Sequence, residues 1–237
     1  MRFLLALSLA FPLPPVLPLS IAPSARSRLE LRDELLRLLP PPSSPLVSPS
    51  ISPLVEALER HATPPATSPF LLLGLEGEWT HRLHAPPPDA PPPPRAAGLV
   101  RLDSVTQTFS EGLVRTTAAF HVPSLPSPSA SASPASPSPP HALSGVLAVE
   151  AEVFPTTRPD MLHLRSRGHT LSLDRSPPEG FDLPRMMGEL VHSLGVEFRA
   201  EAGVVLGVQI TYLDERLRVS RCTTRDLAGF CTVHTRI

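Results

Sequence analysis

Apolar and polar residues alternate from residue 76 to the end of the sequence, which is the pattern of β-strands that bury one face. Residues 99–109 and 112–122 flank a short Ser-Glu-Gly connection and predict a β-hairpin. The alternation continues in further segments, which predict strands over 145–154, 161–167, 169–174, 203–213, 216–222 and 229–236. About eight or nine short strands with turns between them predict a sandwich or an up-and-down barrel.

Two of these strands carry a clear apolar stripe. Over 145–154 the stripe is formed by Leu147, Val149, Ala151 and Val153. Over 203–213 it is formed by Val204, Leu206, Val208 and Ile210, which we expect to be buried. A ligand-facing wall and ordinary core packing require the same residue types, so both explanations of this stripe stay open.

Helical spacing of apolar residues appears in three segments. Leucines three and four apart predict a helix over 29–39, which ends at a run of prolines. Ser52 as N-cap and Pro53 in the first turn predict a second helix. We expect both helices to pack against the domain, because the alternative of membrane-surface helices calls for a strongly basic polar face. A third helix is predicted over 183–194, where it closes an end of the barrel.

The distribution of proline separates segments that we expect to fold from segments that we expect to be disordered. Most of the 33 prolines precede residue 141. Segments 84–95 and 123–141 are rich in Pro, Ser and Ala and have too little apolar bulk to offset their ordering entropy, so we predict disordered insertions there. The predicted organisation is a targeting peptide over 1–25, a helical lead-in with linkers over 26–75, and the barrel over 76–237.

The first 25 residues have the features of a targeting peptide. An apolar run follows Met1 and Arg2, and small residues around Ala22 suit a cleavage site. Prolines interrupt the run, and a membrane span needs about 20 apolar residues. A removable peptide therefore explains this segment better than a membrane anchor.

Charge and motifs narrow the function classes. The net charge is -1, so the chain lacks the excess of basic residues that is typical of a nucleic-acid-binding protein. The two cysteines, Cys222 and Cys231, are too few for a disulfide framework or a zinc site; we expect reduced, half-buried thiols that face each other across a hairpin. The sequence motifs that mark hydrolases, metalloproteases and nucleotide-binding proteins are missing, so the sequence predicts no catalytic residue, metal or cofactor.

Several polar residues invite a more specific hypothesis. His81 and His84 are three apart, which on a regular strand places them on opposite faces, and we expect both to be solvated. Asp214, Arg218 and Arg221 suit either a charge cluster at the mouth or floor of the barrel, or a turn and salt bridge that fix the last hairpin.

A tryptophan and an arginine give the sharpest clue. Gly77 and Trp79 form a G-x-W at the start of the first strand, and Arg218 and Arg221 lie on a near-terminal strand. In lipocalin-like barrels such a tryptophan stacks under an arginine of a last strand. A buried tryptophan that is simply part of the core explains the same residue.

The G-x-W stands in a longer frame. The segment LEGEW (75–79) resembles the L-x-G-x-W that opens the domain of the plastid lipid-associated proteins, also called fibrillins, and VTQ (105–107) is similar to their central V-x-Q strand. The segment ITYLDERLRVSR (210–221) is similar to the family's C-terminal T-Y-L-D-x-x-L-R-I-S-R-G signature. Cys222 stands where the family usually has glycine.

The resemblance implies a mainly β fold, a lipocalin-like antiparallel β-barrel, located in plastids at thylakoids or plastoglobules. It implies a protein that is not an enzyme and that binds or organises carotenoids, prenylquinones or other lipids at a membrane or lipid-droplet surface. The residues that we expect to line the barrel or its ligand are Trp79, Val204, Leu206, Val208, Ile210 and Tyr212. Those with structural roles in the family signatures are Gly77, Asp214, Leu217, Arg218 and Arg221.

Two alternatives remain open at this point. The first is an enzyme or enzyme-partner barrel acting on a prenyl-lipid substrate, which predicts a polar cluster inside the cavity, whereas a lipid carrier predicts a dry cavity. The direction in which Asp214, Arg218 and the histidines face distinguishes the two. The second alternative is a decayed protein whose barrel has no function.

Overall fold

The computed structural model describes residues 26–41, 51–63, 67–85, 100–123, 143–194, 203, 205–224 and 228–237. The described chain is mainly β, with eight strands, as the alternation predicted, and it also has four helices, three of them in the segments whose spacing predicted helices. The targeting peptide predicted over 1–25 lies outside the described residues, as do 86–95 and 124–141 of the two Pro-rich segments. The first of these segments was predicted to begin at residue 84, but β1 continues through Ala85.

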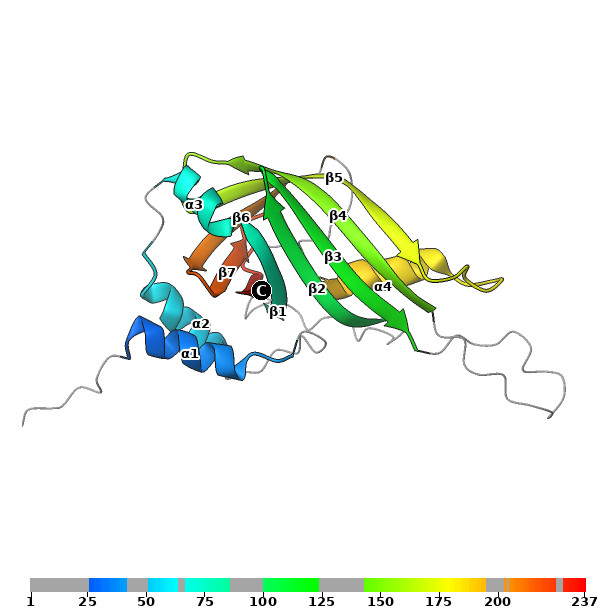
Figure 1. The fold of residues 1–237 in the computed structure, drawn as a ribbon, viewed down its shortest axis with the longest axis horizontal. Coiled ribbons are helices and arrows are strands. Elements are labelled where there is room, and N and C mark those ends of the chain that lie inside the picture. The colour runs from blue at the N-terminus through cyan, green and yellow to red at the C-terminus, as the bar shows by residue number, and fades with distance from the viewer. Residues whose placement is uncertain are drawn as a thin grey trace, which may run out of the picture.

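The eight antiparallel strands form one ringed sheet (Figure 1). Each strand pairs with its neighbours along the chain, and β1 also pairs with β8. The predicted hairpin is β2–β3, whose turn is made by Glu111 and Gly112 with positive φ angles of 52° and 75°. The strands are β1 (Gly77–Ala85), β2 (Arg101–Ser110), β3 (Leu113–Val122), β4 (Leu143–Pro155), β5 (Met161–Leu173), β6 (Val205–Leu213), β7 (Leu217–Cys222) and β8 (Cys231–Arg236).

Strand β5 is continuous where the sequence predicted two strands. Gly168 has a φ of 148°, and the pairing of β4 with β5 shifts between Glu150 and Ala151. Glycine reaches positive φ without a steric penalty, so the chain absorbs the irregularity as a β-bulge and remains a strand. The predicted break at Gly168 was therefore wrong.

The inside of the ring has two different walls. Side chains on β4, β5 and β6 form an aliphatic wall, consisting of Ala151, Val153, Leu162, Leu164, Leu206, Val208 and Ile210. Side chains on β7, β8, β1 and β2 form a polar wall, consisting of His81, Gln107, Arg218, Ser220, Thr232 and His234, all of them buried. Buried polar groups normally need hydrogen bonds, so an interior of this kind is a candidate site rather than a plain core.

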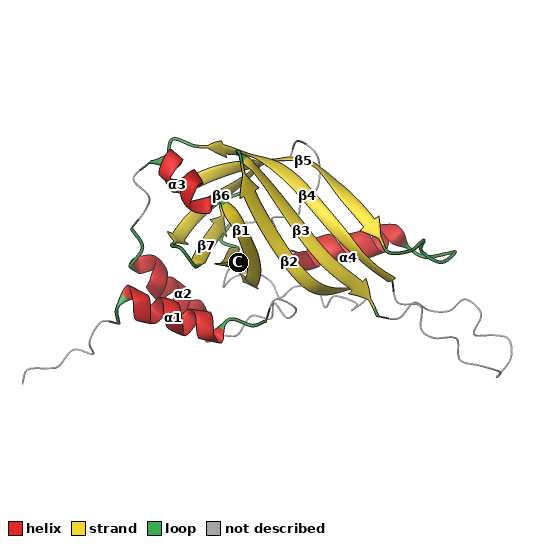
Figure 2. Ribbon diagram, viewed as in Figure 1, coloured by secondary structure: helices red, strands yellow, loops and turns green. Residues whose placement is uncertain are grey.

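Two helices close the ends of the ring (Figure 2). At one end, α3 (Ser68–Leu75) inserts Leu71 and Leu75 into the apolar cluster that contains the aliphatic wall. At the other end, α4 (Leu183–Leu194) packs Met186 and Leu190 against inward residues of β2, β3 and β4. Among the described residues β5 pairs with β6 over Met161–Arg165, and α4 closes this end of the ring, as predicted.

Helices α1 (Arg28–Leu38) and α2 (Ile51–Arg60) pack together on the outside of the ring (Figure 1). A capping box between Ser27 and Glu30 begins α1. Their apolar faces cover outward residues of β1, β6, β7 and β8, which confirms that they pack against the domain. Helix α2 begins at Ile51, so Ser52 lies inside the helix and is not the N-cap that the sequence predicted. No described helix has the length and apolarity needed to cross a membrane.

Candidate functional site

Arg218 lies at the centre of the polar wall. It is only 1% exposed, because alternation along β7 directs its side chain into the ring. One guanidinium nitrogen donates to Oε1 of Gln107, and the Gln107 amide donates in turn to Thr116 Oγ1 at 3.1 Å. The V-x-Q strand and the C-terminal signature therefore meet inside the ring through a hydrogen-bonded chain.

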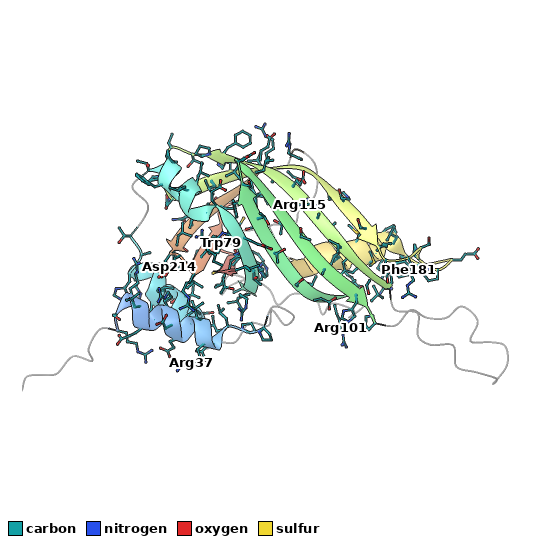
Figure 3. All side chains as sticks on the ribbon, in the orientation of Figure 1. Arg37, Trp79, Arg101, Arg115, Phe181 and Asp214 are labelled. Carbon is teal, nitrogen blue, oxygen red and sulfur yellow. The ribbon has the colours of Figure 1, made fainter. Side chains whose placement is uncertain are left out.

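Trp79 joins this centre to the end helix α3. Its indole Nε1 donates to the Leu75 carbonyl at 2.8 Å, and its ring is fully buried (Figure 3). The guanidinium carbons of Arg218 and Arg236 lie 5.3 and 4.6 Å from the ring centre, within cation–π range. Phe109 faces Arg218 in the same way at 5.0 Å. The predicted stacking of Trp79 with an arginine of a near-terminal strand is confirmed for Arg218.

The histidines are inside the ring, contrary to the prediction. A β-bulge at Arg82 shifts the pairing of β1 with β8, so that both His81 and His84 share the inner side. A hydrogen bond of 3.4 Å joins His81 Nδ1 and His234 Nε2, and His84 stacks on Phe230 with ring centres 5.0 Å apart. The expectation of solvated histidines on opposite faces was wrong, because the bulge flips every later side chain of the strand.

Two small cavities lie inside the ring. One is bounded by both walls, with Arg218, Ser220 and Gln107 of the polar wall and Leu162, Leu164, Val208 and Ile210 of the aliphatic wall, and Phe109 of β2 also lines it. The second is lined by Gln107, Thr116 and Ser166 together with Val114, Val149, Ala151, Leu164 and Leu206. Each has a volume of about 10 Å³, room for about one water molecule.

Ser166 is the one described residue outside the hydrogen-bonded chain that directs an unsatisfied hydroxyl into this region. Its Oγ is buried and has no hydrogen-bond partner among the described residues, although the backbone oxygen of the same residue accepts from Gly203 N at 3.0 Å. A buried hydroxyl without a partner costs free energy, so the second cavity suits a water molecule or a polar group of a ligand.

No known protein family and no curated protein sequence matches this chain.

The predicted apolar stripe of β6 is confirmed where it is described. Leu206, Val208 and Ile210 are buried in the aliphatic wall, whereas Val204 lies outside the described residues. Tyr212 was predicted to join them, but it faces outward. The pairing of β6 with β7 shifts between Ile210 and Tyr212, and this bulge turns the tyrosine into the cluster under α1 and α2. Leu217 belongs to the same outer cluster.

Asp214 stabilises the turn between β6 and β7 beside α1 (Figure 3). It accepts from Tyr212 Oη at 2.7 Å and from the backbone N–H groups of Arg216 and Leu217 at 2.8 Å each. Burial acts to raise the pKa of Asp214, but these three hydrogen bonds and the nearby charge of Arg32 outweigh it, and the pKa lies below its usual value. Burial, followed by the bond to Asp214, raises the pKa of Tyr212.

Arg221 is the third residue of the predicted charge cluster, and it also faces outward. It forms a two-point ion pair with Glu59 of α2, with Nε–Oε1 and Nη2–Oε2 distances of 2.7 and 2.8 Å. Thr211 Oγ1 donates to the same carboxylate at 2.6 Å. Asp214, Arg218 and Arg221 thus form no common cluster: alternation places Arg218 inside, and the other two fix the turn and α2. Of the two alternatives, the turn and salt bridge describe the outer pair.

The two cysteines do not face each other. Cys222 points into the ring, and Cys231 points toward α1 and α2, so the predicted facing pair was wrong. Both are buried and neither forms a disulfide, and burial raises the pKa of the Cys231 thiol to about 12. Among the described residues no group of three or more His, Cys, Asp or Glu is placed to hold a metal ion.

Several residues of the interior were not singled out from the sequence. They are Thr116, Ser166, Ser220, Thr232 and His234, which lie inside the ring, with Ser220 Oγ and Thr232 Oγ1 sharing a hydrogen bond of 2.6 Å. Alternation from Arg218 predicts the inward position of Ser220. Small hydroxyl residues are also common on exposed faces of strands, so residue type alone gives no signal for them.

Proposed function

We propose that this chain is a non-enzymatic member of the plastid lipid-associated protein family, a lipocalin-like barrel that binds or organises hydrophobic small molecules such as carotenoids, prenylquinones or other lipids. Its place is at plastid membranes or plastoglobules, reached through a targeting peptide in residues 1–25. The family assignment rests on the L-x-G-x-W, V-x-Q and C-terminal signatures. The single observation that carries the binding function is the cavity bounded by an aliphatic wall on one side and a polar wall on the other.

Such an interior suits a ligand with a long apolar part and a small polar end. Ligand pockets combine mostly apolar lining with a few placed polar groups that set orientation. The apolar part would lie along Leu162, Leu164, Val208 and Ile210. A quinone or ring hydroxyl oxygen would accept from the donors of the polar wall, and the buried Ser166 hydroxyl offers a second polar contact across the ring.

Neither of the two cavities found among the described residues has room for such a ligand as it stands. Each cavity holds about one water molecule, whereas a drug-sized ligand needs about 300 Å³ or more. Both ends of the ring are closed by helices, α3 and α4, rather than by strands of the sheet. Displacing a helix breaks no strand pairing, so binding would proceed by movement of one end helix and repacking of the aliphatic wall.

A second function is favoured by a specific observation. Arg218, His81, His84 and His234 face inward, and a polar cluster of this kind is what the alternative of an enzyme or enzyme-partner barrel for a prenyl-lipid substrate requires. The buried polar residues of the described chain include no carboxylate. In many catalytic sites a carboxylate orients the histidine that acts as the general base. We therefore place binding first and catalysis second.

Organic extraction of the protein purified from its native cells, followed by mass spectrometry, tests the proposal. An unrelated soluble protein handled in parallel is the control. A prenylquinone or carotenoid at about one molecule per chain supports the carrier function and names the ligand. Nothing above the control contradicts it. A modified prenyl lipid that accumulates only when the protein is incubated with its precursor would instead support the enzymatic alternative.

A further inference from the structure

Helix α3 turns an apolar face to the outside. Phe70 and Leu73 are 64% and 70% exposed, among the highest values for large apolar side chains in the described residues. They lie three residues apart and therefore project from one side of the helix. Leu71 and Leu75 are fully buried from the other side in the ring. An eight-residue helix thus presents apolar side chains to both the interior and the surroundings.

This outward face is held in a fixed position. Trp79 Nε1 donates a hydrogen bond to the Leu75 carbonyl. Nη2 of Arg236 donates to the carbonyls of Gly74 and Glu76 at 2.7 and 2.9 Å. At the other end of the helix, Ser68 Oγ donates to the Thr156 carbonyl in the β4–β5 turn at 3.3 Å. The exposure of Phe70 and Leu73 is therefore a property of an anchored helix.

The charges around α3 indicate which kind of surface would cover it. The helix itself, SPFLLLGL, has no charged residue. The residues that flank α3, and the strand ends and turns at the same end of the ring, include more acidic than basic residues: Glu76, Glu78, Glu111, Asp160, Asp214 and Glu215 against Arg158, Arg216 and Arg236. Arg158 pairs with Asp160 at 2.8 Å, and Arg32 of α1 lies 3.5 Å from Asp214 and 3.8 Å from Glu215. With Arg32 included, acidic residues at this end still outnumber basic ones. An acidic rim repels an anionic membrane, so the matching surface is apolar and carries uncharged headgroups.

We propose that α3 is the membrane-docking element of this protein: Phe70 and Leu73 insert between uncharged lipid headgroups while Leu71 and Leu75 keep the end of the ring closed. Burying exposed apolar area is the driving force, and the acidic rim stays in water. The inference deepens the proposed function and rests on it for the presence of a lipid surface. It does not depend on whether the interior holds a ligand.

Flotation of the full chain with vesicles of pure phosphatidylcholine tests the docking. The double variant F70S/L73S removes the outward apolar face and should bind at least tenfold more weakly, because two large side chains lose their burial. The matched control is L29S/L38S, which removes two apolar side chains of α1 that are 54% and 41% exposed on the helix pair outside the ring. The control should float like the wild type. Equal flotation of F70S/L73S and the wild type overturns the proposal, as does failure of the wild type to float.

Two further readouts make the test specific to α3. The chain has a single tryptophan, the buried Trp79, so Phe70→Trp adds an exposed reporter. Its emission should shift to shorter wavelength on addition of phosphatidylcholine vesicles, with no such shift in the parent chain. Vesicles with about one third phosphatidylglycerol should bind no more tightly at low salt, given the acidic rim. Tighter binding to the anionic vesicles, or an unshifted emission, contradicts the assignment.

The outcome also separates docking from ligand binding. F70S/L73S should retain the same extractable ligand per chain as the wild type, because neither side chain contacts the walls of the ring. Loss of flotation with ligand retained supports α3 as a docking element. An empty wild-type interior combined with flotation through α3 contradicts the carrier function and leaves the docking intact.

Discussion

Replacement of Trp79 by phenylalanine tests how the end helix is held on the ring. The substitution removes the Nε1 donor and leaves the buried Leu75 carbonyl without its 2.8 Å partner, which costs about 1–3 kcal/mol. The smaller ring also weakens the cation–π contacts with Arg218 and Arg236, by about 0.5–1 kcal/mol. The space left by the lost atoms adds about 1 kcal/mol. We expect the free energy of unfolding to fall by about 3 kcal/mol in total.

Urea unfolding followed by far-ultraviolet circular dichroism measures this change without relying on tryptophan fluorescence. Phe70→Leu on the exposed face of α3 is the control and should stay within about 0.5 kcal/mol of the wild type. The dependence on urea should keep its slope, because the fold is unchanged. A loss below about 1 kcal/mol for Trp79→Phe would refute the claim that this indole fastens α3 to the ring.

Three other predictions follow from single sites. Gly145→Ala should destabilise the folded chain by about 2 kcal/mol, because a Cβ there would lie 2.7 Å from a backbone oxygen of β5. In Gly188→Ala of α4 the new Cβ meets no described atom within 4 Å, so this variant should stabilise the fold by about 0.5–1 kcal/mol. Thermal unfolding compares the two variants, and equal effects contradict the packing at Gly145. Burial raises the pKa of the Cys231 thiol to about 12. This thiol should therefore react with a thiol reagent at pH 8 about 100-fold more slowly in the folded chain than in the urea-unfolded chain. Similar rates in the two states would show an accessible thiol and contradict the prediction. Asp214 has a lowered pKa in the folded chain, so its stabilisation is present above the usual aspartate pKa of 3.8 and is lost as the pH falls through the folded pKa. Asp214→Asn should therefore lose less stability than the wild type as the pH falls below about 4, and an unchanged dependence of stability on acid pH contradicts this.

Most strands could be predicted from the sequence because β1 to β4 bury one face more deeply than the other. The β2–β3 hairpin, the stripe of β4 and the helix over 183–194 were predicted correctly. On β7 and β8 the period-two pattern is weaker, since α1 and α2 bury the outer face as well. Distinguishing the inner from the outer face of these strands required knowing where the helices dock.

The candidate site was only partly accessible for a different reason. Bulges at Arg82 and between Ile210 and Tyr212 reverse the direction of every following side chain, and no residue type marks them. One bulge brought the histidines inside, and the other moved Tyr212 outside. Trp79 and Arg218 were found because the G-x-W and the C-terminal signature are specific patterns, whereas the contacts of Glu59 with Arg221 join segments far apart in the chain.

The central claim is that the space between the aliphatic and polar walls of the ring takes up an amphipathic ligand. Titration of the purified chain with a short-chain prenylquinone, read by the emission of Trp79, tests it most directly because this single tryptophan lies against the polar wall. N-acetyltryptophanamide with the same quinone corrects for absorption and collisional quenching. We expect saturable quenching that ends at about one quinone per chain. Quenching that rises linearly and equals that of the free tryptophan derivative would contradict it.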